Sequence, residues 1–161
     1  MLYDSKKFVL ADRVRLTPEE QREIAKEHFD HWFDTAKEFY IDFDNAFKRK
    51  SYKKAAFELH QASEAAYKAI LLVFENYNPN EHFLKTLSKM AAKYDPALRS
   101  IFPKKTYAED KLFKKLDYAY IGGRYDPKYT ITKEELDYLA KCVKKLLDRT
   151  KVICTQRLKA F

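Results

Sequence analysis

Apolar residues recur every three or four positions along most of the chain, which is the spacing of an amphipathic helix. The pattern first becomes clear after Thr17, which can cap a helix that has Pro18 in its first turn and Glu20 completing a capping box. The apolar positions that follow alternate steps of four and three: Ala25, Phe29, Trp32, Ala36, Phe39, Phe43 and Ala46. We therefore predict a first helix over about residues 18–48.

The same periodicity predicts four more helices, over about residues 52–76, 80–93, 107–121 and 133–157. The short polar connection after Lys48 makes the first two helices an antiparallel hairpin. Asn76 and Pro79 stop the second helix. Gly122 and Gly123 are expected to end the fourth, because glycine tolerates the left-handed geometry of a helix stop.

These elements predict an all-α, antiparallel up-and-down bundle of about five helices over residues 17–161. Residues 1–16 are interpreted as an extended N-terminal segment or linker. Only 2 Gly and 5 Pro are present, which leaves little material for β-turns. The first predicted helix carries more aromatic residues than one small core needs, so we expect a homodimer. They are Phe29, Trp32, Phe33, Phe39, Tyr40, Phe43 and Phe47.

The net charge of +8 indicates either affinity for phosphate groups or lysine-rich solvated helix faces, and the sequence leaves both open. The longest apolar run, Ala69–Phe74, is far too short to span a membrane. The chain starts without a secretory signal pattern. Cys142 and Cys154 are interpreted as thiols of a reducing compartment, so we expect a cytoplasmic protein.

We expect neither a metal ion nor a cofactor. None of the four histidines has a glutamate three residues before it, as di-iron bundles require. With Gly122 and Gly123 as its 2 glycines, the chain lacks a phosphate loop and a dinucleotide fingerprint.

Polar residues at helical spacing give one candidate site. Gln61, Glu64 and Lys68 share a face of the second predicted helix. They are interpreted either as part of a ligand site or as a solvated helix ion pair. His60 beside them is typical of a hydrogen-bonded packing residue. Arg124 follows the predicted helix stop, where its guanidinium could meet a phosphate or pair with a nearby aspartate.

The order of these motifs resembles a known family. The residues that carry the resemblance are Ala55, Phe57, His60, Gln61, Glu64, Lys68, His82, Leu84 and Leu87, then Leu116-Asp117-Tyr118, Tyr120, Arg124-Tyr125 and Ile131-Thr132. From about residue 20 to 158 the chain resembles HEPN domains. The resemblance implies a small helical domain, in a family where some members cut RNA and others assist nucleotidyltransferases.

Nuclease members of this family use a closely spaced Arg and His, paired across a dimer, to cleave RNA without metal. Imidazole would act as acid or base and arginine would stabilise the phosphorane charge. Here Tyr129 or a neighbour follows Arg124 in place of the histidine. Tyrosine, with a pKa near about 10, is a poor base at neutral pH. Arg124 and Tyr129 are therefore weak catalytic candidates, and we expect no robust RNA cleavage.

Three functions remain open. The first is a non-catalytic module that binds nucleotide or RNA and partners a nucleotidyltransferase domain, in cis or in trans, because residues 2–5 resemble the end of such a domain. The second is a metal-independent endoribonuclease. The third is a structural dimerisation bundle in which Arg124 makes only salt bridges, for example to Glu64.

The first function predicts a cleft between the loop after the fourth helix and the second helix. Arg124 would meet phosphate, and Lys68 would add charge. Glu64 or Gln61, next to His60, would orient the arginine or a base. Tyr125 or Tyr129 would stack on a nucleobase, a contact that contributes about 1–3 kcal/mol per base.

Overall fold

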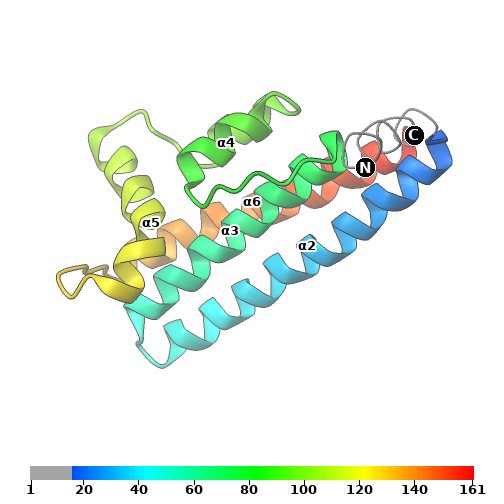
Figure 1. Ribbon diagram of the computed structural model, residues 1–161. Coiled ribbons are helices and arrows are strands. Elements are labelled where there is room, and N and C mark those ends of the chain that lie inside the picture. Colours follow the sequence, from blue (N-terminus) through cyan, green and yellow to red (C-terminus); the bar gives the residue numbers. More distant parts are fainter. Residues whose placement is uncertain (1–15) are drawn as a thin grey trace, which may run out of the picture.

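A computed structural model describes residues 16–161, which form an all-α bundle (Figure 1). The long helices are α2 (Pro18–Lys48), α3 (Tyr52–Glu75) and α6 (Lys133–Lys159), and they run alongside one another. The shorter elements are α4 (Leu84–Ala92), the 3-10 helix η1 (Pro96–Ser100) and α5 (Tyr107–Tyr125). The predicted fold class is confirmed. The segment expected to be extended, residues 1–16, lies outside the described residues apart from Leu16.

The ends of the long helices follow local sequence signals. Capping boxes begin α2, α5 and α6, with Thr17, Thr106 and Thr132 as the N-caps. Lys50, at φ 63°, turns the chain between α2 and α3. Asn76 ends α3 in the left-handed conformation, as its position predicted. Local capping chemistry therefore explains why the predicted and observed ends of these helices agree closely.

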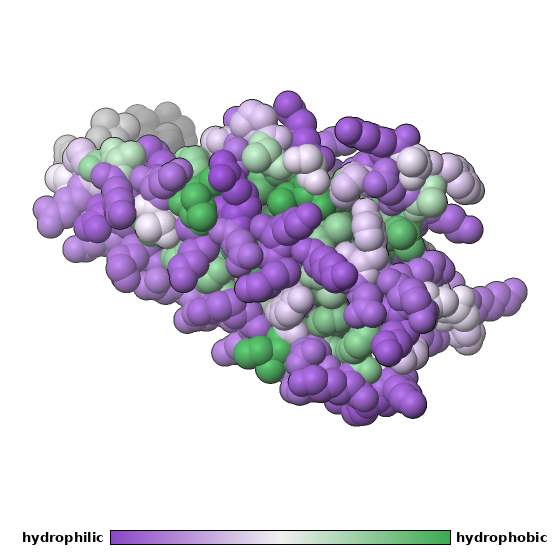
Figure 2. Space-filling model, turned by 180° about the vertical axis from the view of Figure 1, so that it is seen from behind, coloured by the Kyte–Doolittle hydropathy of each residue, from purple (hydrophilic) through white to green (hydrophobic). Residues whose placement is uncertain are grey.

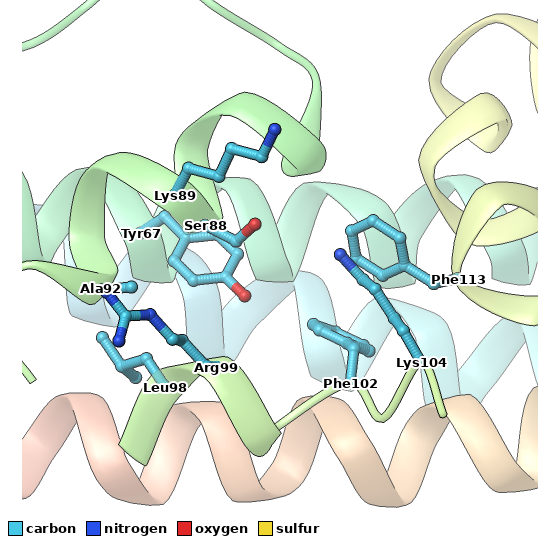
Figure 3. A pocket seen from close by; sticks show the side chains of 9 residues that line it. All are labelled: Tyr67, Ser88, Lys89, Ala92, Leu98, Arg99, Phe102, Lys104 and Phe113. Carbon is cyan, nitrogen blue, oxygen red and sulfur yellow. The ribbon is translucent and has the colours of Figure 1, made fainter. Parts of the chain in front are cut away.

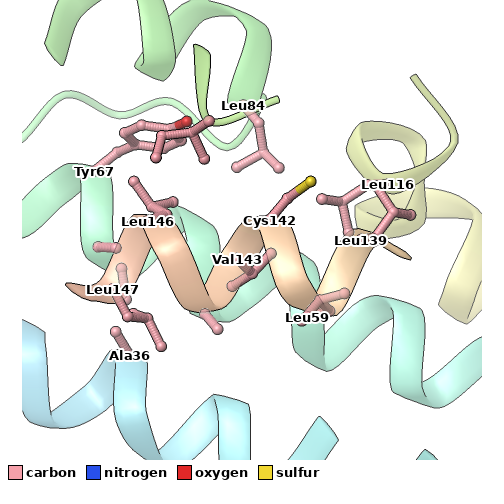
Figure 4. Close-up of a cluster of buried hydrophobic side chains, with 14 of the residues drawn as sticks. Ala36, Leu59, Tyr67, Leu84, Leu116, Leu139, Cys142, Val143, Leu146 and Leu147 are labelled. Atoms are coloured by element: carbon pink, nitrogen blue, oxygen red, sulfur yellow. The ribbon is translucent and has the colours of Figure 1, made fainter. Parts of the chain in front are cut away.

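Helix α3 is the central element and packs against each of the other α-helices. Every residue from Ala62 to Val73 is buried, as required of a helix that is covered on all sides. In the core, Leu139 and Val143 of α6 pack near Leu59 and Tyr67 of α3 (Figure 4). Small side chains on α3 let its neighbours approach closely: Ala55, Ala56, Ala62, Ala65, Ala66 and Ala69.

The aromatic residues of α2 are accommodated within one chain. Phe33 and Phe43 are buried. The others pack, partly buried, against the core: Phe29, Trp32, Phe39, Tyr40 and Phe47. Five of the seven aromatic residues are therefore only partly buried in one chain, and the homodimer that they indicate stays a prediction. The face of the molecule seen in Figure 2 is mainly hydrophilic, with small hydrophobic patches between the polar side chains.

Helix α4 begins later than predicted, at Leu84 instead of about residue 80. Its first amides donate to a carboxylate from α5: Leu84 N lies 2.6 Å from Asp117 Oδ1, and Lys85 N lies 3.2 Å from Oδ2. The carboxylate of Glu81 accepts the amide of Phe83 just before the helix. Because the cap of α4 comes from a distant residue, local sequence gave no signal for its start.

The prediction that the glycines end the fourth helix is wrong, because α5 continues through both to Tyr125 and neither has a positive φ. A Cβ on Gly122 would lie 2.6 Å from Tyr129 Cδ1, and one on Gly123 would lie 3.0 Å from the carbonyl oxygen of Lys53. Glycine is needed here for close packing of α5 and not for a turn.

The stretch between α4 and α5, expected to be irregular, contains η1. Asp95 accepts the amide of Ala97 at 3.2 Å and pairs with Arg149 of α6. The hydrogen bond from Arg149 holds the pKa of Asp95 below its usual range. This pair ties η1 to the long helices and fixes one wall of a cavity described below.

No helix in residues 16–161 has both the length and the apolar character that a bilayer crossing requires. Cys142 and Cys154 are buried free thiols, and burial raises the pKa of each.

Candidate functional site

Side chains from three parts of the chain meet at Tyr120 of α5. The His82 ring stacks on Tyr120 with centroids 4.6 Å apart and an interplanar angle of 9°. The guanidinium carbon of Arg124 lies 4.5 Å from the centroid of the same ring. Glu64 contacts His82 from α3. We call Glu64, His82, Tyr120 and Arg124 the Tyr120 cluster.

Arg124 is held by aromatic rings. Its guanidinium carbon lies 4.7 Å from the Phe57 ring centroid and 4.8 Å from that of Tyr125, in addition to its contact with Tyr120. Its Nε donates to the carbonyl oxygen of Tyr120 at 2.9 Å. Within residues 16–161 the guanidinium has no carboxylate partner, so the salt bridges expected of a structural arginine do not form there.

Glu64 and Lys68 form an ion pair in the interior. Lys68 Nζ lies 3.2 Å from Glu64 Oε2, and the two side chains are only 7% and 9% exposed. Lys68 also lies over the Trp32 ring, at 5.6 Å from its centroid. The prediction of a helix ion pair is confirmed, whereas the expected solvated face is wrong because α3 is covered on that side too.

The Glu64 carboxylate also faces a histidine. His82 Nδ1 lies 3.3 Å from Glu64 Oε1 and 3.4 Å from Oε2. The His82 side chain is 41% exposed, so part of it is accessible from the surface. A carboxylate on one imidazole nitrogen orients the ring, which is an arrangement used in general acid–base chemistry.

His60 and Gln61 lie behind the cluster. The His60 side chain is fully buried, and its ring centroid lies 5.4 Å from that of Tyr120. His60 Nδ1 lies 3.2 Å from Gln61 Oε1, while its Nε2 lies 3.6 Å from Asp117 Oδ1, beyond hydrogen-bond distance. The expectation of a packing histidine is confirmed, and half-buried Gln61 contacts the site through His60.

Tyr129 and Tyr125 differ in their surroundings. Tyr129 is buried over Gly122 and donates to the carbonyl oxygen of Lys115 at 2.9 Å. Burial raises its pKa, so it remains a neutral phenol. Tyr125 is 71% exposed beside Arg124. The structure therefore brings Tyr125 to the site and keeps Tyr129 away from it.

The cleft expected between α3 and the segment after α5 is closed. Gly123 packs directly on the first turns of α3, where its Cβ position is 3.0 Å from Phe57 Cβ. Lys53 Nζ donates to the carbonyl oxygen of Asp126 at 3.0 Å and ties the loop down. A ligand would therefore meet Arg124 and Tyr125 at the surface, and Lys68 would not touch it.

Sequence reasoning did not place His82 and Tyr120 in the site. Both residues belong to the motifs that carry the family resemblance. Tyr120 could have been found from its spacing to Arg124, because residues four apart lie on one face of a continuous helix. Interpreting Gly122 as a helix stop hid that spacing. No cluster of three metal-ligating side chains occurs in the described part of the chain.

Comparison with known proteins assigns this chain to a family. The model of the HEPN domain matches residues 29–153, which is more than half of the chain. The chain therefore belongs to the HEPN domain family, and this membership supports a nucleotide- or RNA-related module. A search of curated proteins found no match. The subtype that accompanies a nucleotidyltransferase stays a prediction.

Glu64→Ala should lower the free energy of unfolding by about 3–5 kcal/mol, because it leaves Lys68 buried without its partner. An apolar pair, Glu64→Leu with Lys68→Met, should cost less than the sum of the single changes. Urea unfolding followed by circular dichroism measures each value.

The matched control is the exposed pair of Lys144 and Asp148, which has the same spacing and the same 3.2 Å separation. Asp148→Ala should cost no more than about 0.5 kcal/mol. If Glu64→Ala costs as little as Asp148→Ala, the buried pair does not hold the site together.

Proposed function

We propose that this HEPN domain binds the phosphate of a nucleotide or of RNA at the Tyr120 cluster, with Arg124 as the anion contact. The observation that carries the proposal is the state of the Arg124 guanidinium. It lies against the rings of Phe57, Tyr120 and Tyr125 and has no carboxylate partner in the described chain. An exposed cation without a counter-charge is available to a ligand.

The chemistry of arginine favours phosphate. Its planar guanidinium carries five N–H donors, and within residues 16–161 one of them, on Nε, is used by the carbonyl oxygen of Tyr120. The remaining donors match two phosphate oxygens. Stacking on rings fixes the plane of the group, so less conformational entropy is lost on binding. The net charge of +8 adds a favourable long-range field.

Tyr125 supports a nucleotide or RNA ligand over a simple anion. Its ring is exposed next to the guanidinium, which leaves it accessible to a base attached to a bound phosphate. Stacking of a base on an aromatic ring contributes about 1–3 kcal/mol. His82, stacked on Tyr120 and partly exposed, adds a further polar side chain at the edge of the same surface.

We further propose that the module is non-catalytic and forms a homodimer. Its partner would be a nucleotidyltransferase domain, either in cis or in trans. The resemblance of residues 2–5 to the end of a nucleotidyltransferase domain motivates the partner. The absence of a histidine after Arg124 motivates the lack of catalysis.

A second candidate function, metal-independent RNA cleavage, is favoured by one observation. The carboxylate of Glu64 faces His82 at 3.3 Å, and His82 shares the Tyr120 ring with Arg124. A histidine distant in sequence thus contacts the same ring as the arginine, although none follows Arg124 in the loop. His82 would act as the acid or base, and Arg124 would stabilise the phosphorane.

Arg124→Ala should weaken binding of a fluorescein-labelled single-stranded oligoadenylate by roughly tenfold or more, which is about 1.4 kcal/mol. Fluorescence anisotropy at two salt concentrations measures the affinity. Stability should fall by no more than about 1.5–3 kcal/mol, because the side chain makes three exposed cation–π contacts that contribute about 0.5–1 kcal/mol each.

Lys128→Ala is the control, since it removes one nearby exposed charge without touching the cluster. It should change affinity much less than Arg124→Ala. Equal losses would mean that the RNA responds to overall charge alone. A wild-type protein with no salt-sensitive binding would contradict the proposed function.

The same RNA, incubated with the protein in chelator and separated on a denaturing gel, tests the second candidate. Under the main proposal the RNA stays intact with every variant. Cleavage that His82→Ala abolishes while binding persists would establish the second candidate instead. Cleavage that persists unchanged in the His82→Ala variant would be assigned to a contaminating nuclease.

A further inference from the structure

A separate cavity of about 280 Å³ lies where α4, η1 and the start of α5 meet α3 (Figure 3). It shares no residue with the Tyr120 cluster. Its lining combines cations, hydroxyl groups and aromatic rings, and the residues are Tyr67, Ser88, Lys89, Ala92, Leu98, Arg99, Phe102, Lys104 and Phe113. This composition is typical of a site for a small organic anion.

The charge in the cavity wall is positive. Lys89, Arg99 and Lys104 come from three different elements or connections, and the lining contains no carboxylate. Burial lowers the pKa of Lys104, and Lys89 nearby lowers it further, while Asp110 outside the lining opposes the shift. Lys89 repels the Lys104 ammonium group, and an anion placed between the two would remove that repulsion.

Tyr67 contributes an unsatisfied hydroxyl. The side chain is completely buried, and its hydroxyl has no hydrogen-bond partner among the described residues. Figure 3 shows the ring in the wall opposite Phe113, with the hydroxyl directed toward the space between them. Burial raises the pKa of Tyr67, so it keeps its proton and remains a donor. A buried hydroxyl left unpaired is destabilising, and a hydrogen bond to a ligand oxygen would offset that cost.

The other side of the cavity is aromatic. The Phe102 and Phe113 rings pack with centroids 5.1 Å apart, and Leu98 lies on the same wall. Lys104 Nζ lies 4.0 Å from the Phe113 centroid, so its side chain runs along this wall, and Figure 3 shows the ammonium group on the side of Phe113 that faces Tyr67. Apolar surface beside a cluster of cations fits a ligand that has a ring at one end and an anion at the other.

We infer that this cavity is a second ligand site, which takes a small organic phosphate monoester. The phosphate lies between Lys89 and Lys104 and accepts a hydrogen bond from Tyr67, and the organic ring packs on Phe102 and Phe113. A phosphate monoester is favoured over a carboxylate because it carries a charge of about −1.5 to −2 at neutral pH, which matches several cations better than a single negative charge does.

Phenyl phosphate is the probe, because it has one ring and one phosphate and fits a cavity of this size. Isothermal titration calorimetry on the full chain should give saturable binding that is tighter than that of inorganic phosphate and of benzoate. Lys104→Gln should weaken binding roughly tenfold, and Tyr67→Phe about fivefold. Lys105→Gln, a change in the neighbouring exposed lysine, should leave the affinity unchanged.

Tyr67→Phe also separates a ligand site from a packing defect. Removing a buried hydroxyl that has no partner should leave the melting temperature unchanged or raise it. Reduced affinity at equal or higher stability therefore supports the inference. Because phenyl phosphate could also meet Arg124 and Tyr125, the titrations are repeated in the Arg124→Ala background, where saturable binding at the cavity should remain, which makes this test independent of the Tyr120 cluster.

Three results would overturn the inference. One is the absence of binding at millimolar phenyl phosphate. Another is an equal loss of affinity in the Lys104→Gln and Lys105→Gln variants, which would indicate a general charge effect. The last is equal affinity for inorganic phosphate and phenyl phosphate, which would show that the rings contribute nothing.

Discussion

Glu64 and Lys68 form a buried ion pair on α3, the helix that its neighbours cover on all sides. The side chains around this pair come from other parts of the chain and compensate its two charges. Taking charged groups out of water costs several kcal/mol per ion unless further partners compensate. Trp32 of α2 covers the ammonium group, and His82 meets the carboxylate. The segment after α3 must therefore bring His82 back to α3, which sets its course before α4 begins.

The same requirement positions the functional surface. When His82 contacts Glu64, the His82 ring offers a face on which Tyr120 stacks. Asp117, one turn before Tyr120 on α5, caps α4. Tyr120 in turn supports Arg124 four residues later. A buried charge on the central helix is thus connected, through two stacked rings, to an exposed guanidinium. The interior fixes the orientation of the arginine without occupying the donors that a phosphate would use.

Local signals predicted the long helices well, because capping boxes at Thr17 and Thr132 and the left-handed Asn76 act within a few residues. Contacts between distant residues were not predictable. Asp117 caps α4 from another helix. Gly122 has the sequence signal of a helix stop, but in the structure it allows close packing against Tyr129 and Tyr118. The candidate site was predicted through Arg124 and Glu64, but the stacked rings between them depend on how α3, α5 and the segment before α4 meet.

The central claim is that Arg124 contacts phosphate on the ring of Tyr120. The most direct measurement follows the side-chain Nε–Hε resonance of Arg124 by NMR as adenosine 5′-monophosphate is added to isotope-labelled protein. Our account predicts a saturable shift of this resonance, accompanied by shifts of the Tyr120 and Tyr125 ring protons at the same ligand concentrations. Nucleotide binding that leaves the Arg124 resonance in place, or no binding to the chain at all, would contradict it.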